Sequence, residues 1–181
     1  MDGIFIQDER ICLAKYEARD YELAYQSWQE PAVIFAYNWR MNRTFSEYLA
    51  FAGDAPWGAA IRDKARGETV GRIGISPGDS PDLTVTIYNG FWGRGYGTAA
   101  CKLAIRYAFA ILKLDQLTAG CYENNEASCR MLIGSGFRRH PEGDETEPHI
   151  VTGENRAQYD FVIEAQDWLR VQGAEVPINP A

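Results

Sequence analysis

Positive charge and long apolar runs are both scarce in this chain, and each scarcity excludes a class of protein. Its 18 lysines and arginines stand against 25 aspartates and glutamates, which gives a formal net charge of −7 at pH 7. Contacts to nucleic acid need a basic surface, so we expect no nucleic-acid partner. No apolar run reaches the roughly 18 residues that span a bilayer, so we expect no membrane partner. The first residues also lack the pattern of a secretory signal, and a cytoplasmic location is therefore the expectation.

Residues that bind metals or form disulfides are sparse too. The two histidines, His140 and His149, have carboxylates nearby but no helical or CxxC-like spacing, so we expect no metal site. The cysteines show no CxxC and no regular spacing, and we expect small buried side chains with free thiols in a reducing compartment. They are Cys12, Cys101, Cys121 and Cys129.

The 181 residues, 46% of them hydrophobic, are enough for one domain with a sizeable core. Apolar periodicity predicts an α/β order with no internal repeat and no dividing linker. Strands are expected at 10–15, 57–65, 69–75, 83–88, 114–122 and 159–165. Helices are expected at 20–30, 44–51, 98–112 and 125–135. The domain should cover residues 1–170, followed by a loosely held tail at 171–181.

Polar residues, glycine and proline mark the expected helix ends. Asp20 is the expected cap of the first helix, and Pro31 stands where that helix should stop. Thr44, with Glu47 three residues on, forms a capping-box pattern that opens the second helix. Gly136 is expected to end the last helix.

A glycine-rich segment separates the expected strand at 83–88 from the long helix that follows. Its sequence is Trp92-Gly93-Arg94-Gly95-Tyr96-Gly97-Thr98. Glycines at such a junction let the backbone approach a ligand, and they leave the first N–H groups of the helix unpaired. Those donors and the positive end of the helix dipole favour a phosphate. The segment therefore predicts a phosphate-bearing ligand.

Three phosphate ligands come into question. A Walker-type loop is excluded, because no Gly-Lys-Ser/Thr follows. A Rossmann dinucleotide site fits formally, since Gly95-x-Gly97-x-x-Ala100 matches its GxGxxA variant and Glu123 lies near the end of the next strand. A Rossmann loop turns directly off its strand, however, whereas residues 89–92 intervene here. The third candidate is coenzyme A, whose pyrophosphate suits several N–H donors at one helix end.

A second motif follows the glycines: Asn125-Glu126-Ala127-Ser128, and then Gly136-Phe137. The ordered set of strand, glycine loop, helix, strand, Asn-x-x-Ser helix and Gly-Phe resembles the GNAT superfamily of N-acetyltransferases. Within it, Trp-Gly-x-Gly-Tyr-Gly and Asn-x-x-Ser are most similar to the branch that contains the ribosomal-protein N-terminal acetyltransferases. The resemblance implies an α/β fold with a mixed, mostly antiparallel twisted sheet, splayed in the middle and flanked by helices. It also implies acetyl-CoA as co-substrate, bound by a core at about 83–140.

The resemblance further implies which residues bind the cofactor. Ile87 would offer its backbone to the thioester end, with Tyr88 next to it, and Asn125 would bind the pantetheine arm. Arg94 either adds charge at the pyrophosphate or is a solvated side chain. The full implied set is Ile87, Tyr88, Trp92, Gly93, Arg94, Gly95, Tyr96, Gly97, Thr98 and Asn125.

Acetyl transfer to an amine needs a base for the amine and a proton donor for the leaving thiolate. Leu132 stands where many family members have the tyrosine that donates this proton, so the resemblance implies Ser128 instead. For the base, Glu147 and His149 are the leading candidates and Glu123 is a further one. His149 suits neutral pH, whereas Glu147 needs a modest rise in its pKa.

The acceptor is expected to be a primary amine, on a protein N-terminus or a small molecule, that attacks directly in a ternary complex. An acidic cluster is either a solvated loop or attracts such a cation; it comprises Glu142, Asp144, Glu145 and Glu147. Aromatic residues of the N-terminal third either line the acceptor site or form core; they are Trp28, Phe35, Tyr37 and Trp39, with Arg40 beside them. The alternative function is a non-catalytic acyl-CoA-binding module. A homodimer is an expectation by analogy alone.

Overall fold

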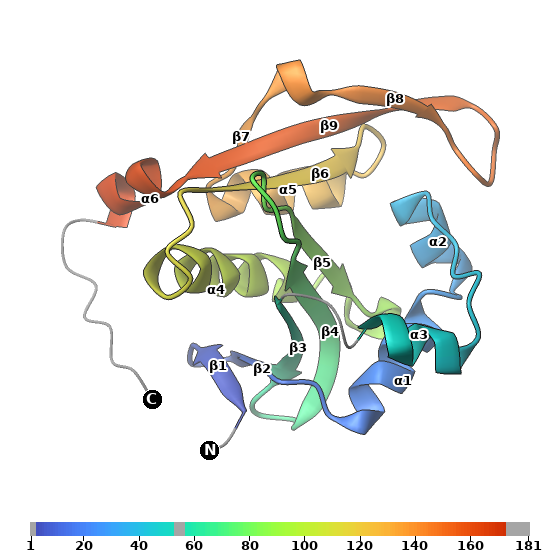
Figure 1. Cartoon of the computed structure of the whole chain (residues 1–181), viewed down its shortest axis with the longest axis horizontal. Helices are drawn as coiled ribbons and strands as arrows, with labels where there is room; N and C mark the ends of the chain where they lie inside the picture. The colour runs from blue at the N-terminus through green and yellow to red at the C-terminus, as the bar shows by residue number, and fades with distance from the viewer. Residues whose placement is uncertain (1–2, 53–56, 173–181) are drawn as a thin grey trace.

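The computed structural model describes residues 3–52 and 57–172, which form two antiparallel sheets and the helices around them (Figure 1). The first sheet has the order β1-β2-β3-β4-β5, with bounds Ile4–Gln7, Ile11–Ala14, Trp57–Asp63, Glu68–Ile75 and Leu83–Ile87. The second sheet has the order β6-β9-β7, and β8 also pairs with β9. Its strands are β6 (Gln116–Tyr122), β7 (Arg138–Arg139), β8 (Glu145–Pro148) and β9 (Asn155–Glu164).

The two sheets meet where β5 and β6 begin and then diverge. A single parallel bridge, Asp82 with Thr118, joins this pair within the described residues, and the Thr118 N–H donates to the Pro81 carbonyl at 2.9 Å. Beyond the bridge, β6 pairs with β9, and Figure 1 shows β5 pointing away from both. The expected splayed, mostly antiparallel sheet is thereby confirmed, and the splay leaves one edge of β5 without a strand partner.

Helices flank both sheets. Three short ones follow β2: α1 (Ala18–Ser27), α2 (Pro31–Tyr37) and α3 (Phe45–Ala52). The remaining helices are α4 (Tyr96–Ala110), α5 (Glu126–Ser135) and α6 (Ala165–Gln172), with 3₁₀ turns η1 (Asn89–Phe91) and η2 (Pro141–Gly143). The buried face of α4 packs on β2 and β5 in the main core. Three fully buried alanines on this face let the helix approach the first sheet closely: Ala100, Ala104 and Ala108.

The first helix begins and ends earlier than its sequence pattern predicts. Glu17 caps α1, and the Asp20 carboxylate accepts the Glu17 N–H at 2.8 Å as the partner in a capping box. Asp20 is therefore not the cap; it is fully buried, where it also pairs with Arg62 at 2.8 Å. Pro31 does not terminate this helix but opens α2, because a proline at the first helical position loses no hydrogen bond.

Other helix ends agree with expectation, and some elements were not expected. Thr44 and Glu47 form the predicted capping box at α3, and Gly136 ends α5 with a φ of 105°. Strands β1 and β8 and helix α6 carry patterns too short to stand out in the sequence. Helix α6 runs to Gln172, so the expected tail begins with helix, and its remainder at 173–181 lies outside the described residues.

Candidate functional site

A cavity of about 610 Å³ opens where β5 and β6 diverge. Its walls come from the β5 edge, the glycine segment, α2 and the first turns of α5. A smaller cavity of about 180 Å³ continues from it toward Asp82, and the two share Tyr37, Asn125 and Ser128 among their walls. Most of the implied cofactor residues thus lie around one groove; the exceptions are Tyr88 and Arg94, which do not line it.

The exposed edge of β5 offers backbone groups to this groove. The Tyr88 N–H donates to the Val70 carbonyl at 2.9 Å, so alternation along the strand turns the Val85 and Ile87 amides away from β4 and into the gap. Side chains already bond the two carbonyls on this edge. The Tyr37 hydroxyl donates to Val85, and the Trp92 indole donates to Ile87 at 2.6 Å. Ile87 therefore presents its N–H to the groove, whereas Tyr88 faces the other way.

The glycine segment forms a concave row of amides. Gly93 and Gly95 have φ values of 71° and 78°, a left-handed conformation that other residues adopt only at a cost. Helix α4 begins at Tyr96, two residues before the predicted start. Among the described residues, none of the N–H groups from 93 to 98 donates to a protein acceptor, and the Ala99 N–H is the first that does, to Gly95 at 3.2 Å. Such converging donors at a helix N-terminus form an anion site.

Arg10, which sequence reasoning missed, holds this row of amides in place. Its guanidinium donates to the Arg94 carbonyl at 2.6 Å and lies 4.3 Å above the Tyr96 ring. The Tyr96 hydroxyl, buried below, donates to the Asp63 carboxylate and is the main cause that lowers the pKa of Asp63. Arg10 and Arg94 are 84 residues apart, so no local pattern could reveal their contact. Tyr96 is thus an anchor of the loop.

The first turn of α5 forms the opposite wall. Asn125 caps the helix, and its side-chain oxygen accepts the Ser128 N–H at 3.1 Å. The Ser128 hydroxyl makes no hydrogen bond within the described residues and lines both cavities. Leu132 is buried in the core. Gly97 faces this helix so closely that an added Cβ would lie 2.5 Å from the Met131 sulfur, so its small size also serves helix packing.

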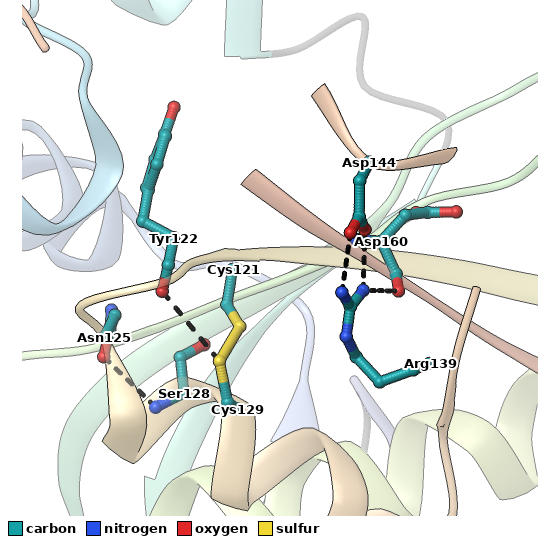
Figure 2. Close-up of a disulfide and its surroundings, with 8 residues drawn as sticks. All are labelled: Cys121, Tyr122, Asn125, Ser128, Cys129, Arg139, Asp144 and Asp160. Atoms are coloured by element: carbon teal, nitrogen blue, oxygen red, sulfur yellow. Dashed lines mark hydrogen bonds and ion pairs between the residues drawn. A yellow bond between two sulfur atoms is a disulfide. The ribbon is translucent and has the colours of Figure 1, made fainter. Parts of the chain in front are cut away.

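A disulfide between Cys121 and Cys129 ties β6 to α5 beside these residues (Figure 2). The Cα atoms are 6.0 Å apart, and the closed loop contains Asn125 and Ser128. The expectation of four free thiols is therefore wrong for this pair: the turn after β6 folds the first turn of α5 back against the strand. Cys12 and Cys101 are free and buried, and burial raises the pKa of Cys101 to about 12.

Tyr122 and Glu147 lie at the wide end of the gap. The Tyr122 hydroxyl donates to the Glu147 carboxylate, and Tyr122 lines the smaller cavity. Burial, followed by this bond to Glu147, raises the pKa of Tyr122 to about 12. Hydrogen bonds from Tyr122 and Asn38 lower the pKa of Glu147. The pKa of Glu147 thus moves opposite to the rise that a base role was expected to need.

His149 has a structural position. It is 1% exposed, its Nε2 lies 2.8 Å from the Phe35 carbonyl, and its Nδ1 accepts the N–H groups of Val151 and Thr152 at 3.3 and 3.4 Å. Since both ring nitrogens are occupied, neither is free to take a proton from an amine. The ring instead links the turn between β8 and β9 to α2. Glu123, the further candidate, accepts the Ala157 N–H at 3.3 Å.

The acidic cluster is mostly a paired, solvated surface. Asp144 receives both terminal nitrogens of Arg139 at 2.6 Å (Figure 2), and this contact chiefly lowers the pKa of Asp144 to about 2. Glu142 lies 3.5 Å from His140. Glu147 is the member of the cluster that reaches the gap, through Tyr122.

The N-terminal aromatic residues divide between core and groove. Trp28 is buried, and its ring packs edge-on against Tyr37 and Trp39 at 5.0 and 4.8 Å. Phe35 and Tyr37 line the larger cavity, whereas Arg40 is exposed and lines neither. Trp28 therefore belongs to the core, whereas an acceptor role for Phe35 and Tyr37 stays a prediction.

Across residues 3–52 and 57–172, no group of three or more histidines, cysteines, aspartates or glutamates is arranged to hold a metal ion. In the same ranges, no helix has both the length and the apolar character needed to cross a bilayer.

Comparison with known proteins identifies the family. Residues 10–138 match the family model described as an acetyltransferase (GNAT) domain. The chain therefore belongs to the GNAT acetyltransferase family.

Individual relatives agree with this assignment. FsC-acetyl coenzyme A-N(2)-transacetylase of Aspergillus fumigatus is 33% identical over 87 residues, which is 45% of this chain and 35% of that protein. The chain thus matches about a third of that relative's length. A GNAT-family acetyltransferase from Bacillus anthracis shares the fold at a TM-score of 0.75 and 21% identity, over 89% of this chain and 98% of that one. Spermidine N-acetyltransferase from Vibrio cholerae, solved with CoA and spermine, has a TM-score of 0.80 at 16% identity, over 90% and 99% of the two chains.

Proposed function

We propose that this protein transfers an acetyl group from acetyl-CoA to a primary amine, by direct attack within a ternary complex. The observation that carries the proposal is the groove between the β5 edge and the first turns of α5, which is also lined by the glycine segment, whose amides at 93–98 donate to no acceptor among the described residues. A long ligand with a diphosphate at one end and a reactive group at the other matches its shape and its donors.

These donors support one orientation of the cofactor. Its pyrophosphate would accept the N–H groups of the glycine segment, and its pantetheine arm would run between the β5 edge and Asn125. The Ile87 N–H would then point at the thioester carbonyl and stabilise the oxyanion as the amine attacks. Tyr37 and Trp92 each bond one lone pair of a β5 carbonyl, which leaves the other for the amides of the arm.

Two protons must move during the transfer. As the C–N bond forms and the C–S bond breaks, the leaving thiolate would take the proton of the Ser128 hydroxyl, and Ser128 would take a replacement proton from solvent water. This hydroxyl lines the groove and has no partner among the described residues. The amine would give its proton to the Glu147 carboxylate, relayed by the Tyr122 hydroxyl that already donates to it. A concerted relay avoids ionising Tyr122, whose raised pKa disfavours a phenolate. Tyr122 carries no motif, so sequence reasoning had no signal for it.

The acceptor is an amine on a protein N-terminus or on a small molecule. The glycine and Asn-x-x-Ser motifs favour the branch of ribosomal-protein N-terminal acetyltransferases, whereas the structural neighbours include spermidine N-acetyltransferases.

Release of free thiol tests the proposal. Protein and acetyl-CoA are incubated with a panel of amino acids, polyamines and short peptides, and the thiol is followed with a chromogenic disulfide. Amine-dependent release supports an enzyme. Tight binding of acetyl-CoA without release by any amine would contradict the enzyme and support the non-catalytic module.

A further inference from the structure

Arg72 of β4 is a partly buried cation without a counter-ion. Within the described residues its side chain makes no ion pair and no hydrogen bond, and its guanidinium lies 4.3 Å above the Trp28 ring. Its Nε is buried without a partner. Buried charges are normally paired, because desolvation without compensation is costly. The half-buried Arg72 guanidinium therefore has donors that a ligand could use.

The side chains around Arg72 do not neutralise it. Burial raises the pKa of four nearby tyrosines by more than the charge of Arg72 lowers it, so their hydroxyl groups are neutral. They are Tyr16, Tyr37, Tyr48 and Tyr88. The nearby carboxylate of Asp20 is already bonded, to Arg62 at 2.8 Å and to Thr69 at 2.7 Å. The positive charge of Arg72 is thus left uncompensated by these neighbours, which suits it to an anion.

Two buried hydroxyl groups of this region also lack partners: that of Tyr88, on which the charge of Arg72 acts, and that of Ser27, which precedes Trp28 in the chain. The Tyr88 hydroxyl and the Ser27 hydroxyl are buried without a hydrogen bond among the described residues, and their side chains are 7% and 2% exposed. Both line a cavity of about 380 Å³ between α1 and the turn from β3 to β4. Native proteins leave few buried polar groups unsatisfied. Arg72 does not line this cavity itself, but the unsatisfied hydroxyl groups support a polar ligand in the same region.

Arg72 is close to the point of acyl transfer. It pairs with Thr86 in the register of β4 and β5, one residue before Ile87. Opposite side chains on neighbouring strands start about 5 Å apart. Trp28, which covers Arg72, touches Tyr37, and Tyr37 lines the groove. Contacts from Arg72 through Trp28 to Tyr37 therefore connect the guanidinium with the wall of the groove.

We propose that Arg72 binds a carboxylate of the acceptor, so that the substrate is an amine that also carries an acid group. This inference rests on the proposed acetyl transfer. It excludes a polycation as the preferred acceptor, because an uncompensated guanidinium repels one. The carboxylate belongs either to a free amino acid or to an acidic residue near a peptide N-terminus.

The test compares matched amines. Each ω-amino acid from glycine to 6-aminohexanoate is paired with the n-alkylamine that lacks its carboxylate, and spermidine serves as the polycation. Peptides with glutamate or glutamine at the second position separate the two sources of the carboxylate. Thiol release gives kcat and KM, and calorimetry on the CoA-bound protein gives the affinity for each amine even where no thiol is released.

We expect one amino acid to have a KM about 10- to 100-fold lower than that of the alkylamine without its carboxylate. This ratio corresponds to the contribution of one charge-assisted hydrogen bond. Arg72→Gln should abolish that preference and leave the affinity for acetyl-CoA unchanged. Arg66→Gln removes the same charge from an exposed residue paired with Glu68 at 3.7 Å, and should retain the preference.

Three outcomes decide the matter. Equal affinity for amino acids, glutamate peptides and their uncharged partners would overturn the anion site, as would a preference that survives in Arg72→Gln. Binding that depends on both the carboxylate and Arg72, without thiol release from any amine, would uphold the site and contradict the acetyl transfer.

Discussion

Reduction of the Cys121–Cys129 disulfide is expected to lower the stability of the protein and its affinity for acetyl-CoA. The bond closes a loop over a sequence separation of 8. In the chain-entropy model, a crosslink that closes a loop of this size lowers the entropy of the unfolded chain and so stabilises the folded protein by about 2–3 kcal/mol. A loss of 1 kcal/mol lowers Tm by roughly 2–4 °C in a domain of this length, so reduction should lower Tm by about 5–10 °C.

Affinity should fall for a separate reason. The closed loop holds Asn125 and Ser128, so opening it frees the capped turn that forms one wall of the groove. Ordering that turn again on binding has an entropic cost. Calorimetry with acetyl-CoA, with and without a phosphine reductant, measures this loss.

The double variant Cys121→Ser/Cys129→Ser provides the control. It should melt at the temperature of the reduced protein and show no further response to reductant. The reasoning is refuted if reductant leaves the Tm of the wild type unchanged, or if alkylation of the unreduced, unfolded protein labels all four cysteines.

Three further predictions follow from single contacts. Ser128→Ala should lower kcat at least about 10-fold with little change in the affinity for acetyl-CoA, as for loss of a general acid; unchanged turnover would show that another group protonates the thiolate. Arg139 lowers the pKa of Asp144 to about 2 in the folded protein, below the value of about 4 expected in the unfolded chain. The free energy of unfolding should therefore increase as the pH rises from about 2 to about 4. Asp144→Asn should flatten that increase in acid-unfolding curves. In Gly134→Ala the added Cβ lies in open space on α5, so this variant should raise the free energy of unfolding by about 0.5–1 kcal/mol. In Gly97→Ala the added Cβ would clash with Met131, so no such gain is expected. Denaturant titrations of both variants measure the difference.

Local signals in the sequence predicted the centre of the site. The glycines at 93, 95 and 97, the Asn125 cap and Gly136 each act through their own backbone or a neighbour a few residues away, so their pattern is sufficient. The splay of the sheets was predicted only from the family resemblance, because a single bridge between Asp82 and Thr118 produces no recognisable sequence pattern.

What escaped prediction depends on distant contacts. Arg10 reaches the glycine segment across 84 residues, and Arg62 reaches Asp20 across 42. The occupied ring nitrogens of His149 result from α2, more than a hundred residues earlier in the chain. The downward pKa of Glu147 follows from Tyr122 and Asn38, which no motif connects to it. In each case the tertiary fold decides the chemistry of the residue.

Calorimetric titration of acetyl-CoA into two glycine variants tests the central claim most directly. Gly93 and Gly67 have φ values of 71° and 66°, and an added Cβ meets nothing within 4 Å at either, so Gly93→Glu and Gly67→Glu share the same strain and added charge. Gly93→Glu should bind about 100-fold more weakly or not at all, since each lost charge-assisted hydrogen bond contributes about 1.5–3 kcal/mol, while Gly67→Glu should bind like the wild type. Equal affinity in the two variants would contradict a diphosphate site at residues 93–98.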